Sequence, residues 1–328
     1  MFIIRLMSDR EIINWVFYGH LWIALAATGL SWLSLRVTYG HQSCVSEWPV
    51  LTFVFFSTLS VYTLHRFLSF QRAERRPTTL RYGIVRQHPR TSLMVGGVST
   101  LAAGILGLKF ISTIWPAILL ALPVTVFYLT PPASGWRRLR DLPYLKNLWV
   151  ALAWTVMTVV VPILVMESWA FRADRDAFDF PELINLFSCV PVAPLNYQNF
   201  SLELVTRLLF TGCIAMLFDL RDVALDRAQG VCTVAGEHPF LHRILVFSCL
   251  VVCALANFLC SHSGLLDTGI GAVMCLGYFL MVPVAFFTYR KSSEDWYAVV
   301  VNGLLLLPPL VYWLADILGA DAGAVRGL

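Results

Sequence analysis

Long apolar stretches alternate with short polar connections along almost the whole chain. Each stretch is close to or above the roughly 18 residues that an α-helix needs to cross the hydrocarbon core of a bilayer. The pattern therefore predicts an all-α, multi-pass integral membrane protein with about nine transmembrane helices. The nine stretches are Ile13–Leu35, Trp48–Phe70, Ser92–Leu108, Ile111–Leu129, Leu145–Met166, Phe200–Phe218, Leu241–Cys260, Thr268–Phe287 and Trp296–Leu318.

The composition supports a membrane location. Hydrophobic residues make up 58% of the 328 residues, and charged residues make up 13%, about half the roughly 25% of an average soluble domain. Such a composition excludes a disordered chain, which needs low hydrophobicity and high net charge. A net charge of +4 on a chain of this size gives no sign of nucleic-acid binding. The lipid bilayer is the partner that the composition predicts.

The distribution of basic residues predicts the orientation. If the N-terminus is cytoplasmic, 17 lysines and arginines fall on the inner side and five on the outer side, as the positive-inside rule requires. We therefore expect the C-terminus outside, most simply in a bacterial inner membrane. Residues 1–328 form one predicted transmembrane domain, with an outer cap loop near 167–199. Cys44 and Cys189 would both face outside, as free thiols or as a disulfide.

A cluster of acidic residues follows the sixth apolar stretch. Asp219, Asp222 and Asp226 fall on one face if the helix continues. Carboxylate oxygens are preferred ligands of Mg²⁺, which commonly also binds substrate phosphates. Arg221 and Arg227 would add direct phosphate contacts. The alternative is a solvated helix end that carries both signs of charge.

The wider sequence around these aspartates resembles a known motif. The string Asp-x-Arg-Asp-x-x-x-Asp-Arg-x-x-Gly-x-x-Thr over 219–233 is similar to the second aspartate-rich motif of the UbiA superfamily of membrane prenyltransferases. The segments 127–132 and 142–147 also resemble the family. The resemblance implies a helical bundle that transfers an isoprenoid group from a prenyl diphosphate to an acceptor, which the sequence does not identify.

The resemblance also assigns roles to individual residues. Asp222 and Asp226 would be the catalytic residues and, with Asp219, the Mg²⁺ ligands. Lys146 and Asn147, at the start of the fifth stretch, would help to bind the diphosphate. All of these groups would face a cavity that opens toward the cytoplasm.

One expected feature of the family is missing. Its first motif, Asn-Asp-x-x-Asp-x-x-x-Asp, belongs at the inner end of the second stretch, but residues 61–76 contain no aspartate. Arg66 lies there instead, beside His65. Its guanidinium would either bind phosphate oxygens directly or extend to the membrane interface as an anchor. The protein is accordingly a prenyltransferase or, alternatively, a degenerate UbiA-like protein that binds or presents an isoprenoid lipid or acts as a scaffold.

A second charged pair lies inside the sixth stretch. Glu203 and Arg207 are four residues apart, the spacing of an ion pair on a helix. Arg207 would lie roughly 16 Å from Phe218 at 1.5 Å per residue, near the middle of the bilayer. The spacing predicts a buried structural pair, and the alternative is a role in lining a cavity.

Overall fold

The described part of the protein is helical throughout. The structure is a computed structural model, and it describes residues 9–39, 47–72, 79–128, 130–175, 195–266, 268–291 and 293–318. No strand occurs among these residues. The α-helices are α1 (Asp9–Tyr18), α2 (Leu21–Tyr39), α3 (Trp48–Arg72), α4 (Gly83–Gln87), α5 (Pro89–Phe127), α6 (Lys146–Thr155), α7 (Val161–Arg175), α9 (Tyr197–Ala228), α10 (Val234–Glu237), α11 (Pro239–His262), α12 (Thr268–Thr288) and α13 (Leu307–Ile317). Shorter helical segments are η2 (Leu80–Tyr82), η3 (Leu139–Asp141), η4 (Val156–Val160), η5 (Trp296–Val301) and η6 (Leu304–Leu306).

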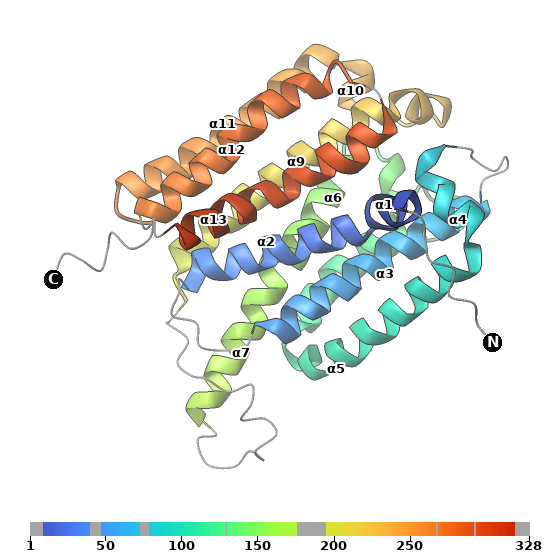
Figure 1. Cartoon of the computed structure of the whole chain (residues 1–328). Coiled ribbons are helices and arrows are strands. Elements are labelled where there is room, and N and C mark those ends of the chain that lie inside the picture. The colour runs from blue at the N-terminus through green and yellow to red at the C-terminus, as the bar shows by residue number, and fades with distance from the viewer. Residues whose placement is uncertain are drawn as a thin grey trace.

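Within these residues, eight helical segments are long and apolar enough to cross a membrane. One of them, α5, passes through the bundle twice. Ser60 of α3 hydrogen-bonds Thr100 near the start of α5, and His65, only five residues further along α3, contacts the backbone of Thr125 near the end of α5. A straight helix would separate Thr100 from Thr125 by roughly 37 Å at 1.5 Å per residue, so α5 must reverse its direction, as Figure 1 shows. The third and fourth predicted spans are therefore two passes of one continuous helical segment.

The first predicted span is too long at its N-terminal end. The structure divides it into α1 and α2 at Gly19 and His20, and His20 has a positive φ of 69°, which residues other than glycine rarely adopt. α1 runs across the other helices in Figure 1. Of the two helices, only α2, which begins at Leu21, is long and apolar enough to cross the membrane.

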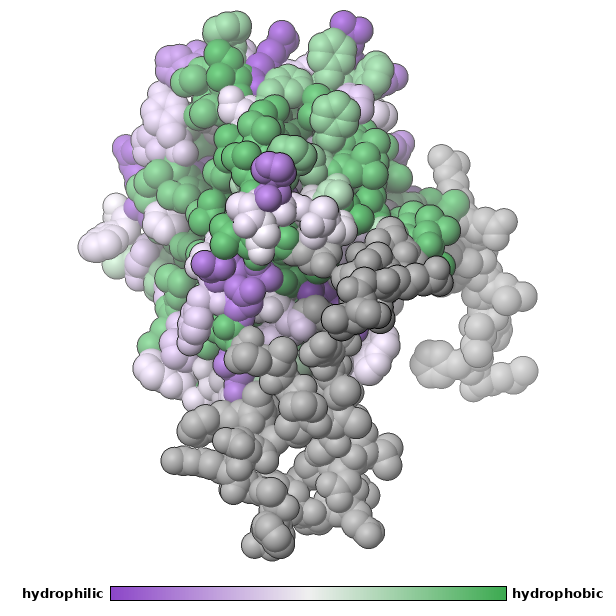
Figure 2. All heavy atoms as spheres, turned by 90° about the vertical axis from the view of Figure 1, so that its left-hand side faces the viewer, coloured by the Kyte–Doolittle hydropathy of each residue, from purple (hydrophilic) through white to green (hydrophobic). Residues whose placement is uncertain are grey.

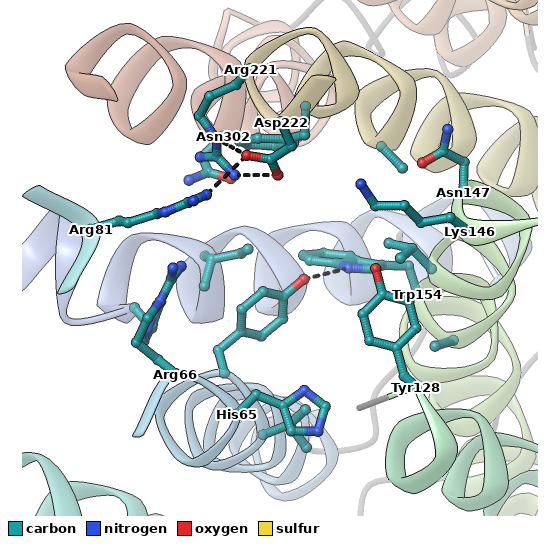
Figure 3. A pocket seen from close by; sticks show the side chains of 18 of the residues that line it. His65, Arg66, Arg81, Tyr128, Lys146, Asn147, Trp154, Arg221, Asp222 and Asn302 are labelled. Carbon is teal, nitrogen blue, oxygen red and sulfur yellow. Dashed lines mark hydrogen bonds and ion pairs between the residues drawn. The ribbon is translucent and has the colours of Figure 1, made fainter. Parts of the chain in front are cut away.

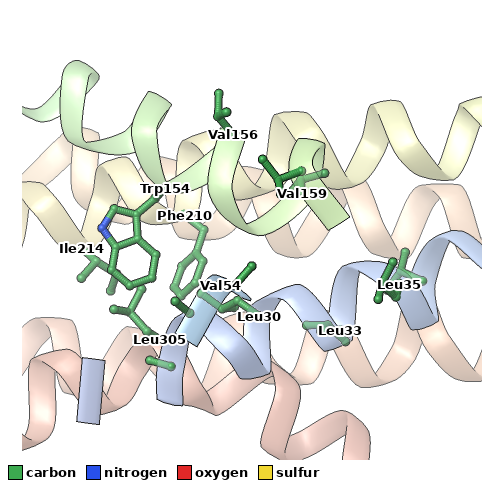
Figure 4. Packing of buried hydrophobic residues seen from close by; sticks show 14 of the residues in the cluster. Leu30, Leu33, Leu35, Val54, Trp154, Val156, Val159, Phe210, Ile214 and Leu305 are labelled. Atoms are coloured by element: carbon green, nitrogen blue, oxygen red, sulfur yellow. The ribbon is translucent and has the colours of Figure 1, made fainter. Parts of the chain in front are cut away.

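α2 lies at the centre of the bundle. Its side chains Leu30 and Leu33 are fully buried in the core, and Leu30 lies beside Val54 of α3 and Phe210 of α9 (Figure 4). Small residues of α2 such as Ser34 are also fully buried. In a bilayer, lipid tails are as apolar as the core, so close packing through small residues replaces the hydrophobic effect as the force between helices.

Large apolar side chains cover much of the outer surface. Examples from three helices are Leu108, Leu255 and Phe279, all more than half exposed. Figure 2 looks onto the left-hand end of the bundle in Figure 1 and shows apolar side chains gathered over the upper part of that face. A water-soluble protein does not expose apolar surface on this scale, so the protein is an integral, multi-pass membrane protein. Most of the predicted cap loop, together with Cys44 and Cys189, lies outside the described residues.

Candidate functional site

Helices α3, α5, α6 and α9 line a pocket of about 310 Å³ at one end of the bundle, within the roughly 300–1,000 Å³ of small-molecule sites. Its charged residues come from distant parts of the chain (Figure 3): Arg66 lies in the last third of α3, Arg81 belongs to η2, Lys146 begins α6, and Asp222 lies on α9. The fold thus brings together the second, fifth and sixth predicted spans at one end.

Lys146 forms ion pairs with two of the three aspartates of the motif. Its Nζ lies 2.8 Å from Oδ1 of Asp219 and 2.7 Å from Oδ2 of Asp226. Both carboxylates are only 1% exposed. Asn147 donates from Nδ2 to Oδ2 of Asp219 at 2.6 Å, and Nη2 of Arg140 lies 3.5 Å from Asp226. The spacing of the two aspartates, two helical turns apart, lets one ammonium group reach both.

Asp222 is held by two arginines. Arg221 binds it with both Nε and Nη2, at 3.0 and 3.1 Å, and Nη1 of Arg81 donates to Oδ1 at 2.9 Å. The rings of Phe218 and Tyr297 lie 5.0 and 5.5 Å from the Arg221 guanidinium. Paired and stacked in this way, Arg221 has a fixed orientation at the pocket wall.

Three donors at the pocket remain unused. Arg66 forms no hydrogen bond or ion pair with any described residue, and its guanidinium lies 5.1 Å from the ring of Tyr82. Nε of Arg81 and Nε1 of Trp149 are buried and have no hydrogen-bond partner among the described residues. Buried donors are normally satisfied, so these groups suit a polar ligand.

The remainder of the pocket is aromatic and aliphatic. Trp154 donates to the hydroxyl of Tyr62 at 2.9 Å, and Val124 and Phe218 add apolar surface. Tyr128 also lines the pocket, and its hydroxyl can donate a hydrogen bond. The pocket is therefore amphiphilic, because charged side chains line one part of it and apolar side chains line the rest.

The predicted Mg²⁺ site does not fit this arrangement. Across the ranges that the structure describes, no three His, Cys, Asp or Glu side chains form a group that could hold a metal ion. Asp219 and Asp226 converge on the ammonium of Lys146, whereas Asp222 turns toward Arg221 and Arg81. A metal at the aspartates would have to displace the chain's own cations.

The predicted site residues divide into two groups. Asp219, Asp222, Lys146, Asn147, Arg66 and Arg221 line the pocket, and Asp226 lies directly behind Lys146. Arg227 does not fit the prediction, because its Nη2 donates to the carbonyl of Gly236 and it does not line the pocket. Sequence reasoning missed Arg81, counting it only among the inner basic residues, because its contact with Asp222 spans 141 positions.

The predicted pair inside the sixth span is confirmed. Glu203 and Arg207 form an ion pair, and both side chains are almost fully buried. Arg207 also donates to the carbonyl of Leu30 and to Ser34 on α2, at 3.2 and 3.1 Å, and to Thr158 on η4 at 3.2 Å. It lies away from the pocket, so its role is structural.

Comparison with known proteins identifies the fold. No protein-family model and no curated protein sequence matches the chain. Three chains of solved structures do, and two of them show the fold. One, from work on the biosynthesis of a digeranylgeranylglyceryl phosphate synthase in membranes, has a TM-score of 0.54 and 10% identity, over 95% of this chain and 99% of that chain. The other, a UbiA homologue from Archaeoglobus fulgidus, has a TM-score of 0.55 and 11% identity, over 94% and 98%. This chain therefore has a UbiA-like fold.

Proposed function

We propose that the protein binds a prenyl diphosphate in this pocket and transfers the isoprenoid group to an acceptor. The observation that carries the proposal is the amphiphilic lining, with Arg66 and Arg81 at one end and Trp154 and Phe218 along the wall. A prenyl diphosphate has the same division into a doubly phosphorylated head and an apolar tail. The UbiA-like fold, shared with a protein described as a digeranylgeranylglyceryl phosphate synthase, supports the same substrate class.

The pocket's donors would promote loss of the diphosphate. In this step the bond between the first isoprenoid carbon and oxygen breaks, and its electron pair leaves with the diphosphate. Arg66, Arg81 and the hydroxyl of Tyr128 would stabilise the developing negative charge, because fixed donors act most strongly in a site that excludes water. The aromatic wall would keep water from the allylic cation. An acceptor nucleophile would then attack that carbon and lose a proton.

Release of pyrophosphate tests the proposal. The purified protein would be given farnesyl or geranylgeranyl diphosphate, with a membrane lipid extract as the source of acceptor. We expect release above background, reduced at least roughly tenfold in Arg81→Gln, which loses a charge-assisted contact. Arg137→Gln removes the same charge from an exposed position outside the pocket and should match the unsubstituted protein. No release, from folded protein, would contradict transfer.

One observation favours a second candidate, a UbiA-like protein that binds or presents an isoprenoid lipid without transferring it. All three aspartates of the motif, Asp219, Asp222 and Asp226, are already paired with basic side chains of the same chain. The two candidates differ in the same assay. Tight binding of the prenyl diphosphate without release of pyrophosphate would identify the binding protein.

A further inference from the structure

We infer that the head of the bound lipid is held directly by three arginines, without a divalent metal ion. These are Arg66, Arg81 and Arg221, which we call the arginine cluster. The inference rests on the proposed function for the identity of the lipid, a prenyl diphosphate. It goes further, because it assigns the head to side-chain cations and makes Mg²⁺ unnecessary for binding.

Arg66 is the first reason. It is partly buried at the pocket wall, yet no described carboxylate lies within ion-pair distance of its guanidinium. Removing a charge from water without a partner is strongly unfavourable. Arg81 adds repulsion between like charges, because both guanidinium groups lie close to the same ring. The distance to the Tyr82 ring is 5.1 Å for Arg66 and 5.6 Å for Arg81. An anion between the two guanidinium groups, which point into the same space in Figure 3, would relieve both problems.

The free donor positions are the second reason. Arg81 uses Nη1 for Asp222 and leaves Nε buried and unpaired. Asp222 also holds Arg221 through two bonds, so one carboxylate orients two guanidinium groups along the pocket wall. Planar guanidinium groups match the paired oxygens of phosphate. Asp222 is in this view a positioning residue for the arginine cluster.

The aspartates are the third reason. A Mg²⁺ ion that bridged a diphosphate to Asp219 and Asp226 would meet the ammonium of Lys146, less than 3 Å from both carboxylates. Lys146 thus supplies from within the chain the positive charge that these carboxylates need. From α3, the pocket is lined by His65 and Arg66 and by no acidic residue.

The inference predicts an unusual response to Mg²⁺. In solution Mg²⁺ binds the oxygens of the diphosphate, the same atoms that the arginine cluster would contact. Added Mg²⁺ should therefore leave the affinity unchanged or weaken it, whereas a metal-bridged site would bind only when Mg²⁺ is present.

Calorimetric titration in detergent tests this response. The probe is geranylgeranyl S-thiolodiphosphate, which resists loss of its head, and inorganic pyrophosphate is titrated in parallel. We expect binding of the lipid probe in excess EDTA at an affinity equal to or higher than that in Mg²⁺. Arg66→Gln and Arg81→Gln should each weaken it roughly 10- to 100-fold, the effect of losing one hydrogen bond to a charged group. The exposed control Arg137→Gln should bind like the unsubstituted protein.

Each other outcome has a definite meaning. Binding that requires Mg²⁺ would overturn the inference and leave the proposed function intact. Failure of the lipid probe to bind in either buffer would overturn both. Equal affinity for pyrophosphate and the lipid probe would support the arginine cluster but contradict a pocket for the prenyl tail. Arg66→Lys guards against misfolding, because it keeps the charge and should retain part of the affinity lost in Arg66→Gln.

Discussion

Lys146 is the residue on which the charge balance of the site depends. Its ammonium lies between Asp219 and Asp226, two carboxylates that are almost completely removed from solvent. A buried pair contributes little net stability compared with an apolar replacement of both partners, but removal of one partner leaves the other charge uncompensated. The pair should therefore respond very differently to single and to combined substitutions.

Replacement of Lys146 by Met tests this balance. We expect Lys146→Met to lower the free energy of unfolding by about 3–5 kcal/mol, measured by thermal or denaturant unfolding in detergent. The triple variant Lys146→Met/Asp219→Asn/Asp226→Asn should recover part of the loss, because no charge is left unpaired. An unchanged melting temperature in Lys146→Met would show that Lys146 does not hold the two carboxylates.

We also predict that Lys146→Met, unlike the unsubstituted protein, is stabilised by Mg²⁺. With the ammonium removed, Asp219 and Asp226 present oxygens to one another across the space it occupied, a donor set suited to Mg²⁺. We expect added Mg²⁺ to raise the melting temperature of Lys146→Met and to leave that of the unsubstituted protein unchanged. Stabilisation of the unsubstituted protein by Mg²⁺, lost in Asp219→Asn, would argue for a natural metal site at these aspartates.

Among the helices, α9 contacts its neighbours through one buried cation, Arg207. Arg207 is 0% exposed and bonds to Glu203 on its own helix, to Leu30 and Ser34 on α2 and to Thr158 on η4. Polar contacts of this kind join helices where the lipid offers no alternative partner. Arg207 therefore fixes how α9 sits against α2.

The prediction for this contact is a loss of stability without a change in ligand selectivity. Arg207→Met should lower the free energy of unfolding by about 3–5 kcal/mol, because Glu203 is then buried without a counter-ion. Glu203→Gln/Arg207→Met should be the more stable of the two. The measurement is equilibrium unfolding in mixed micelles, and equal stability of the two variants would contradict a coupled pair.

Two glycines give a matched test of helix packing. A Cβ added at Gly271 of α12 would lie 2.3 Å from Cβ of Ser261 and 3.0 Å from the carbonyl of Asn257 on α11, whereas one added at Gly97 of α5 would meet nothing within 4 Å. We expect Gly271→Ala to lower the melting temperature by forcing the helices apart. Gly97→Ala should leave it unchanged or raise it, since alanine favours helix over glycine by about 1 kcal/mol. Equal effects would contradict the close approach of α11 and α12.

The whole bundle has a charged pocket at one end, which we predict from the positive-inside rule to face the cytoplasm. Cys232, in the connection after α9, is exposed at this end, and its carbonyl accepts from the backbone nitrogen of Tyr144. Its thiol therefore reports which side of the membrane the pocket faces.

Labelling of Cys232 tests the orientation. In a Cys44→Ser/Cys189→Ser background, we expect a membrane-impermeant maleimide to modify Cys232 in opened membranes and not in intact cells. Cys232→Ser in the same background is the control for labelling of other cysteines. Modification in intact cells would place the pocket outside and reverse the predicted topology.

The membrane spans could be predicted because the bilayer sets the length and the apolarity of each span, and both are visible in the local sequence. The break at His20 was not, since the apolar stretch continues through it and only the backbone turns. The i, i+4 spacing of Glu203 and Arg207 was enough to predict their pairing. The contact between Arg81 and Asp222 was not predictable, because it depends on where η2 packs against α9. Likewise, the position of Arg227 next to Asp226 did not reveal that its side chain turns to Gly236.

A structure of the protein with geranylgeranyl S-thiolodiphosphate would show directly how the head of the lipid is held. We expect both phosphates within hydrogen-bond distance of Arg66 and Arg81, the isoprenoid chain along Trp154, and Lys146 still between Asp219 and Asp226. Density for a metal ion bridging the phosphates to Asp219 and Asp226, with Lys146 displaced, would contradict this expectation.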